Sequence, residues 1–440
     1  MSSPSSPAAA NGFAVLRNRN FAAYLSARLL STIAMQMVNL AVGWQVYALT
    51  HSVTDLGLIG LAQFAPFFVL VLPAGQIADR YDRRVIINVA FAVQGIAALL
   101  LLAFTISGVT AVWPVFAAAA LAGCARAFMM PASQAIVMNL VPNHLFGQAT
   151  AISSSSFHAA VIAGPVLGGV LYLLGPHVVY TVATGVLALS VVLMWLVRSQ
   201  QTAKREPVSL AGVLDGFRFI WSRKIVLGAI SLDLFAVLFG GAVALLPVFA
   251  HDVLHVGPTG LGILRSAPAV GAALTSVALA FWPIRRHVGR WMFGGVALFG
   301  AATIVFGLST SVLLSVVALA LTGVGDMVSV YIRHMLVQFE TPDAIRGRVS
   351  AVNAVFIGAS NELGEFESGT TAGWFGLIPA VVFGGAATLV VTGLWMRIFP
   401  VLSHMDRFPH ENRSGDAPAA TLEPAPPAGQ QAPAVALVTK

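Results

Sequence analysis

The ten residues GQIADRYDRR at 75–84 carry five charges and separate two long apolar runs, roughly 56–74 and 85–106. Apolar runs of about 20 residues are long enough to cross the ~30 Å hydrocarbon core of a bilayer as helices. The same alternation of apolar run and polar break continues in both directions along the chain. It predicts an all-α integral membrane protein that crosses the bilayer many times.

Composition supports this class, because 58% of the residues are hydrophobic and only 9% are charged, which is far from the balance of a soluble domain. The stretch between Arg126 and Arg198 contains no Asp, Glu, Lys or Arg. The apolar runs predict twelve transmembrane helices, at roughly 21–49, 56–74, 85–106, 111–131, 149–173, 178–197, 225–249, 260–282, 291–309, 312–331, 349–373 and 377–399.

The basic residues give the orientation. All but three of the 24 Lys and Arg residues lie in alternate polar breaks, one of which holds Arg333. Under the positive-inside rule these breaks face the cytoplasm, which places both termini there. Orientation accounts for the net charge of +7, so no nucleic-acid partner is expected. Residues 1–20 lack the apolar segment of a signal peptide.

The chain divides into two halves that resemble each other. Shifted by 200 residues, the first half overlays the second at Gly123 with Gly323, Pro142 with Pro342, Gly164 with Gly364 and Gly169 with Gly369. Six helices separate the copies, so both halves have the same topology and enclose a binding site near the midplane. The predicted parts are a cytoplasmic tail at 1–20, six-helix bundles at 21–197 and 225–400, a cytoplasmic linker at 198–224 with an amphipathic stretch, and a disordered cytoplasmic tail at 401–440.

The opening run resembles the cytoplasmic loop signature of the major facilitator superfamily. The matching residues are Gly75, Asp79, Arg80, Arg83 and Arg84. Asp82 stands where that family usually has glycine. The resemblance implies that the loop latches one half against the other, with Gly75 allowing close approach and Asp79 accepting from a helix N-terminus. The alternative is that Arg83 and Arg84 are ordinary orientation charges.

The fifth predicted helix carries GPVLGG at 164–169, which is similar to the exporter signature of the same superfamily. Gly164, Gly168 and Gly169 would let helices touch closely, and Pro165 would bend the helix. Ordinary glycine-rich packing is the alternative. The runs DLFAVLFGGAVALLPVF at 233–249 and NELGEFESG at 361–369 resemble the enterobactin (siderophore) exporter group.

Eight charged residues fall inside predicted helices, where each costs about 2.5–3.5 kcal/mol if it faces lipid. They are Arg28, Arg126, Asp233, Arg265, Asp326, Glu362, Glu365 and Glu367. In the repeat Arg28 overlays Asp233 and Arg126 overlays Asp326. We therefore expect pairing across a central cavity, with Arg126 and Asp326 as a gate; pairs inside one half are the alternative.

Glu362 and Glu365 share a helix face, since they are three residues apart. Two crowded carboxylates disfavour each other's charge, so one of them can carry a proton. Glu365 is the first candidate for proton coupling, then Glu362, with Asp233 as the alternative. Glu367 is expected to form an ion pair with Arg265.

These features favour a secondary active exporter in a bacterial inner membrane, a monomer that moves a small amphipathic molecule, namely a siderophore, in exchange for protons. A multidrug or macrolide-type efflux carrier is the alternative, and a passive channel is the third class. The chain shows no nucleophile, base and acid arrangement, no metal-ligand spacing and no nucleotide-binding loop, so neither an enzyme nor a cofactor or metal is expected.

Overall fold

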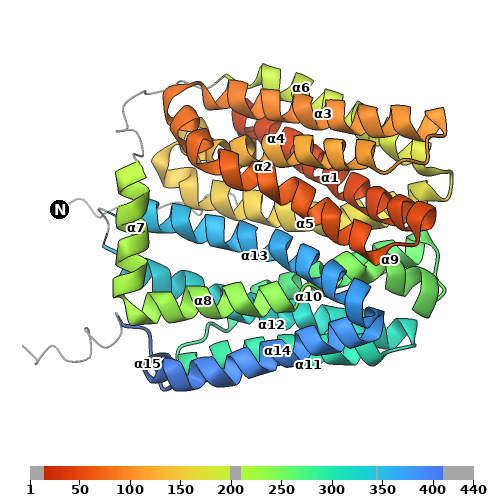
Figure 1. Ribbon diagram of the computed structural model, residues 1–440. Helices are drawn as coiled ribbons and strands as arrows, with labels where there is room; N and C mark the ends of the chain where they lie inside the picture. The colour runs from red at the N-terminus through yellow and green to blue at the C-terminus, as the bar shows by residue number, and fades with distance from the viewer. Residues whose placement is uncertain (1–13, 199–209, 343–344, 410–440) are drawn as a thin grey trace, which may run out of the picture.

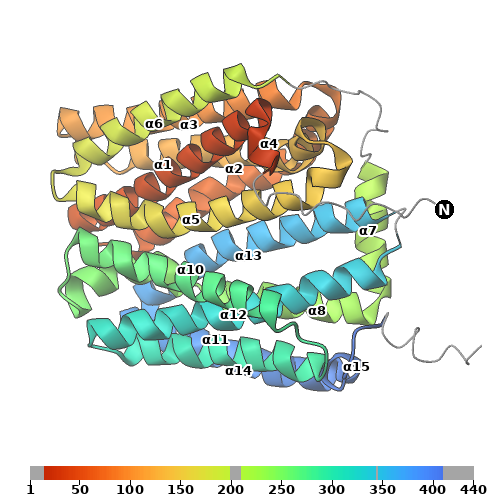
Figure 2. The same cartoon turned by 180° about the vertical axis from the view of Figure 1, so that it is seen from behind.

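The computed structural model describes residues 14–198, 210–342 and 345–409, and every regular element in these ranges is a helix. Two bundles lie side by side (Figures 1 and 2). The first contains α1 (Arg19–Thr50), α2 (Val53–Arg80), α3 (Arg83–Ser107), α4 (Trp113–Leu140), α5 (Phe146–Tyr172) and α6 (Pro176–Leu196). The second contains α8 (Lys224–Phe239), α9 (Leu246–Val248), α10 (Pro258–Phe281), α11 (Val288–Leu308), α12 (Val312–Glu340), α13 (Arg346–Phe375) and α14 (Leu377–Ile398).

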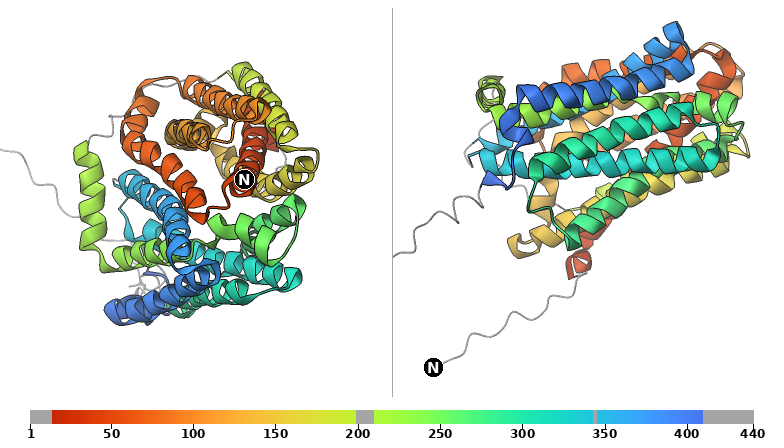
Figure 3. Two further views of the ribbon diagram at one scale, coloured as in Figure 1. Left: turned by 45° about the vertical axis from the view of Figure 1, so that its right-hand side comes forward. Right: turned by 90° about the horizontal axis from the view of Figure 1, so that it is seen from below.

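Eleven of the described helical segments are long and apolar enough to cross a membrane. α13 is not one of these eleven segments, although it is as long as they are, at 30 residues. It runs beside α2 and α8 in the middle of the molecule (Figure 3). Its lower hydropathy follows from the three glutamates it carries, which the surrounding helices shield. The all-α membrane fold predicted from the apolar runs is confirmed.

The two ends of the molecule differ in charge. At one end α2 ends at Arg80, α3 begins at Arg83 and α8 begins at Lys224; we call it the basic end. The connections at the other end, such as 108–112 and 254–257, contain no Lys or Arg; we call it the neutral end. Figure 1 places the basic end on the left, beside α7 and α15.

Three helices run further toward the basic end than the apolar runs predict. α2 continues to Arg80 and α4 continues through Pro131 to Leu140, because neighbouring helices shield the backbone groups that a proline frees inside a membrane helix. α12 ends at Glu340 instead of near 331. Arg333 therefore lies inside a helix, which corrects its predicted place in a polar break.

The seventh predicted span is not one continuous helix. α8 ends at Phe239, and the chain continues through Gly241 into a 3₁₀ turn, α9 and a π-helical turn at Phe249–Val253. A side chain on Gly241 would collide with the carbonyl of Gly364 on α13. The glycine thus lets two backbones cross closely at the level where α8 breaks.

Two short helices lie at the basic end, α7 (Leu210–Ser222) and α15 (Pro400–Ser403). α7 packs on α13 through stacked rings of Phe217 and Phe356, 6.4 Å apart. Residues 401–409, predicted to be disordered, instead fold back. The N–H of Gly289 donates to Met405 O at 2.9 Å, and Leu402 and Phe408 are buried. The predicted tails at 1–13 and 410–440, and linker residues 199–209, lie outside the described residues.

Candidate functional site

A cavity of about 630 Å³ lies between the two bundles, in the size range of sites for small organic molecules. Aromatic rings form part of its wall, and amide side chains form another part. These lining residues are Phe157, Phe299, Phe306, Gln36, Asn39, Gln63 and Asn361. The wall also holds five charged residues: Arg126, Arg265, Glu362 and Glu365 form one group, and Asp326 belongs to a second.

The first group joins the two halves. Arg126 on α4 donates from Nη1 to Glu362 Oε1 on α13. The Glu362 side chain is 8% exposed, whereas that of Arg126 is 39% exposed and lies over the ring of Phe67, 5.2 Å from its centre. Arg126 thus pairs with a residue of the opposite half, which is Glu362 rather than the predicted Asp326.

The same group contains Arg265 on α10 and Glu365 on α13. Arg265 interacts electrostatically with both Glu365 and Glu362. Glu365 packs against Gly60 on α2, where a Cβ would lie 3.2 Å from Glu365 Oε2. The group therefore contains two guanidinium groups and two carboxylates, and when all four are ionised its charges balance.

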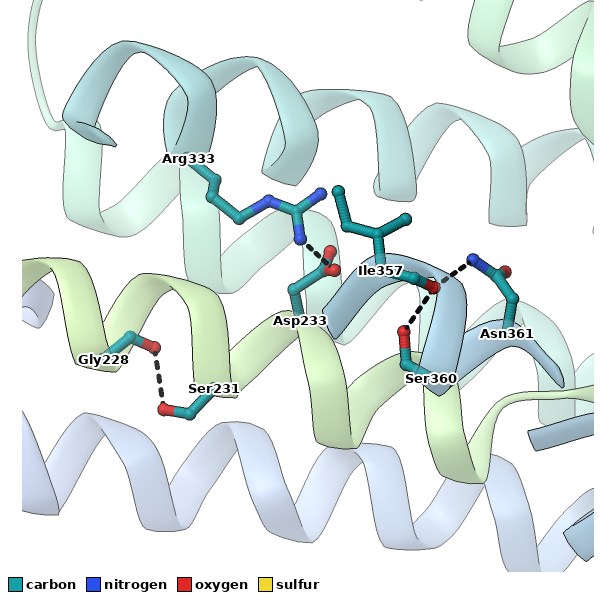
Figure 4. A network of polar contacts seen from close by, with 7 residues as sticks. All are labelled: Gly228, Ser231, Asp233, Arg333, Ile357, Ser360 and Asn361. Atoms are coloured by element: carbon teal, nitrogen blue, oxygen red, sulfur yellow. Dashed lines mark hydrogen bonds and ion pairs between the residues drawn. The ribbon is translucent and has the colours of Figure 1, made fainter. Parts of the chain in front are cut away.

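The second group belongs to the second half. Arg333 on α12 donates from Nη1 to Asp233 Oδ2 on α8, and the two side chains point at each other beside α13 (Figure 4). Their exposures are 3% and 6%. Asp326 on α12 borders the cavity and interacts electrostatically with both.

Arg28 and Glu367 do not have the partners expected from the sequence. Arg28 on α1 lies over the ring of Phe157 at 5.9 Å, while its repeat counterpart Asp233 is held inside the other half. Glu367 accepts from Thr371 Oγ1 at 2.8 Å instead of pairing with Arg265. Phe157 comes to Arg28 from α5 of the same half, whereas Thr371 lies four residues beyond Glu367 on the same face of α13.

The loop signature at 75–84 makes its described contacts within the first half. Arg83 Nη1 donates to Ala135 O at 3.4 Å and Arg84 Nη1 to Val197 O at 2.8 Å, while Arg80 is exposed. Gly75 has no atom within 4 Å of an added Cβ, so close approach does not explain it here. The side chain of Asp79 lies outside the described residues.

The glycine motif of α5 faces two partners. Gly164 and Gly168 lie against Gln36 and Met37 of α1, and Gly169 lies against Pro258 at the start of α10. On the same interface the carbonyl of Pro165 lies beside Gly262. α5 therefore contacts its own half through two glycines and the opposite half through the third.

Polar side chains at the neutral end join the two halves, and sequence reasoning did not single them out. Tyr47 on α1 donates to Asp252 Oδ2 in the π-helical turn, and His251 Nδ1 lies 2.5 Å from Asp252 Oδ1. The rings of His51 and His251, one from each half, are 6.0 Å apart. The sequence did offer a signal for this contact, because Asp252, His51 and His251 lie in polar breaks that hold no Lys or Arg.

Comparison with known proteins agrees with this architecture. The family model described as transmembrane secretion effector matches residues 10–423. The enterobactin exporter of Citrobacter koseri is 26% identical over 396 residues, covering 88% of this chain and 93% of that protein. The enterobactin exporter of Escherichia coli (strain K12) is 24% identical over 404 residues, covering 90% and 96%.

Solved structures share the fold at low sequence identity. A POT family transporter in complex with a thioalcohol-conjugated peptide superposes with a TM-score of 0.72 at 13% identity, over 88% of this chain and 97% of that one. A bacterial homologue of the iron transporter ferroportin gives 0.66 at 16% identity, over 88% and 99%. This multi-pass inner-membrane chain belongs to the transmembrane secretion effector family of the major facilitator superfamily, whose members carry small molecules across membranes and are not enzymes.

Proposed function

We propose that this chain exports a siderophore, a small amphipathic iron chelator, in exchange for protons by alternating access. The observation that carries the proposal is the charged group of Arg126, Glu362, Arg265 and Glu365 in a cavity between the halves. The relatives named enterobactin exporters, similar over about nine-tenths of the chain, support the substrate class.

The cavity offers the chemistry that such a molecule needs. Siderophores bind iron through catechol or hydroxamate groups, whose hydroxyls donate hydrogen bonds and whose anions accept them. Glu365 accepts most strongly from a hydroxyl while it is ionised, with both carboxylate oxygens as acceptors, and Arg126 and Arg265 can donate to an anion. The rings of Phe157 and Phe299 provide an apolar wall for the aromatic or aliphatic body of the ligand.

Exchange with protons follows from competition for the same oxygens. A proton on Glu365 removes an acceptor that the substrate uses, so substrate and proton bind alternately. Proton entry from outside then resets the carrier, and release inside frees Glu365 for the next substrate. We place both termini in the cytoplasm. Residues 21–197 and 225–400 move as the two halves of a monomer, and Asp79 belongs to a loop that latches these halves together.

Transport in inverted membrane vesicles tests the proposal. Vesicles acidified inside should accumulate enterobactin against its gradient when they contain the protein, and collapse of the pH gradient should abolish accumulation. A panel of macrolides and cationic dyes serves as the comparison. Accumulation of those drugs but not of enterobactin would identify a drug carrier, and downhill, non-saturating flux of all compounds would identify a channel.

A further inference from the structure

The polar side chains on one face of α12 form a line from the cavity toward the basic end. Asp326, Ser329 and Arg333 are spaced by three and four residues, so they share that face. Together they extend about 10 Å along the helix at 1.5 Å per residue. Asp326 is at the cavity, and Arg333 is deeper, where Asp233 of α8 meets it.

This line has more carboxylates than guanidinium groups. Asp233 and Asp326 both interact with Arg333, and His334 also interacts with Arg333 and Asp233. A single guanidinium balances one carboxylate. Two ionised carboxylates in this low-dielectric place would leave one buried charge without a partner, at a cost of several kcal/mol.

The charges of the adjacent helices do not supply the missing partner. Arg265 on α10 acts on Glu362 and Glu365 of α13, and Arg126 pairs with Glu362. α11 carries only Arg290, in its first turn at the basic end. The positive charges around the cavity are therefore already assigned to the other group.

Two buried polar atoms along the line have hydrogen-bonding capacity to spare. Within the described ranges, neither Ser329 Oγ nor Arg333 Nε has a hydrogen-bond partner. Ser329 lies one turn from Asp326 on one side and one turn from Arg333 on the other. A hydroxyl that both donates and accepts, next to an unpaired donor, can hand a proton along the helix face.

We infer that Asp326, Ser329, Arg333 and Asp233 form a second proton-binding site, in which Asp326 carries the proton while Asp233 stays paired with Arg333. The proton forms an O–H bond to a carboxylate oxygen of Asp326, which leaves the group neutral. Its release breaks that bond and gives the group one net negative charge. Asp233 is the poorer carrier because it is almost fully enclosed and already accepts from Arg333.

A role of this site in transport rests on the proposed proton coupling. The site binds its proton in the second half of the molecule, apart from Glu365. The exposed His334 lies one residue beyond Arg333 toward the basic end. The line thus leads from the cavity toward the end predicted to be cytoplasmic, the direction in which an exporter must discharge protons.

Infrared difference spectroscopy of the protein in lipid vesicles tests this site without a transport substrate. Spectra at acidic and alkaline pH, in H₂O and D₂O, show the carbonyl band of a protonated carboxyl group. We expect a component of that band at neutral pH that is present in the wild type, lost in Asp326→Asn and retained in Glu365→Gln. The control Glu340→Gln, at the end of the same helix, should leave it unchanged.

The variant Asp233→Asn tests whether the two carboxylates, Asp233 and Asp326, share the single guanidinium group of Arg333. With one carboxylate left for one guanidinium, Asp326 should ionise beside Arg333, so the same component of the neutral-pH band should also disappear. A carbonyl band that is the same in Asp326→Asn as in the wild type, or the same in Asp233→Asn, overturns the inference. If Asp326→Asn does not fold, Asp326→Glu must shift the band, and an unshifted band has the same meaning.

The outcomes separate this inference from the proposed function. Wild-type vesicles that show the band but move enterobactin without a pH gradient would refute proton-driven export and leave the site standing. Vesicles that couple export to protons equally well in wild type and Asp326→Asn, without any change in the band, would refute the site alone.

Discussion

At the scale of single residues, the pair of Arg126 and Glu362 is an ion pair that joins the two halves. Removing one partner leaves the other charge uncompensated in the cavity. We therefore expect Arg126→Glu and Glu362→Arg each to reduce enterobactin export by about twofold to a hundredfold, since contacting residues couple by about 0.5–3 kcal/mol. The double exchange should recover part of the rate in the vesicle assay.

The exchange of Arg126 with Asp326 is the control for the pair of Arg126 and Glu362. Exchanging Arg126 with Asp326 restores charge complementarity at the positions that the sequence repeat matches, although the structure does not pair them. That double variant should be no better than its single variants. Recovery there, without recovery in the Arg126 and Glu362 exchange, would mean that the gate pair predicted from the repeat governs transport.

Glu365 is the residue that should separate substrate movement from proton movement. Glu365→Gln keeps the shape of the side chain and removes its ability to exchange a proton. Export driven by a pH gradient should fall to the background rate, while exchange of labelled for unlabelled enterobactin at fixed pH should continue. Gradient-driven accumulation that survives in this variant would transfer the coupling to Asp233 or Asp326.

At the scale of helices, packing depends on glycines at specific crossings. A Cβ on Gly323 of α12 would overlap the carbonyl of Pro268 on α10, so the two helices would have to separate. We expect Gly323→Ala to destabilise the protein by about 1–3 kcal/mol, the usual cost of overpacking, seen as a lower midpoint of thermal unfolding in detergent.

Gly185 on α6 is the matched control for that change. It is also a helical glycine, but nothing lies within 4 Å of an added Cβ. Gly185→Ala should therefore be neutral or slightly stabilising through helix propensity. Equal unfolding midpoints for the two variants would show that the crossing of α10 and α12 is looser than the structure indicates.

At the scale of the whole molecule, the contact of Tyr47 with Asp252 holds the neutral end closed across the two halves. Outward opening has to break it. We expect Asp252→Asn and Tyr47→Phe to shift the population toward opening at that end. Spin labels on cysteines at Ser107 and Ser311, in a Cys124→Ala background, should show a longer distance in both variants than in the parent.

Asp55 provides the control for the closure. It lies in the first turn of α2 at the same end, so Asp55→Asn removes a nearby negative charge without touching the contact. The label distance should stay unchanged in that variant. The same distance distribution in Asp252→Asn and in the parent would show that the contact does not hold the halves together.

The amino-acid sequence by itself determined the class of this protein. Apolar runs, the placement of arginines and the run at 75–84 were sufficient for the all-α membrane fold and for the superfamily, because insertion into a bilayer depends on local hydropathy and charge. It also singled out eight charges inside apolar runs as candidates for a functional role, since an ionised residue there is costly if it faces lipid.

Only the tertiary structure decided which charges meet. Arg333 stood at the edge of an apolar run and read as an orientation charge, yet α12 carries it inward to Asp233. Arg126 met Glu362 because α4 and α13 face each other across the cavity, a relation that the 200-residue repeat does not encode. Partner choice depends on distances of a few ångströms between helices far apart in the chain, and hydropathy patterns hold no information at that range.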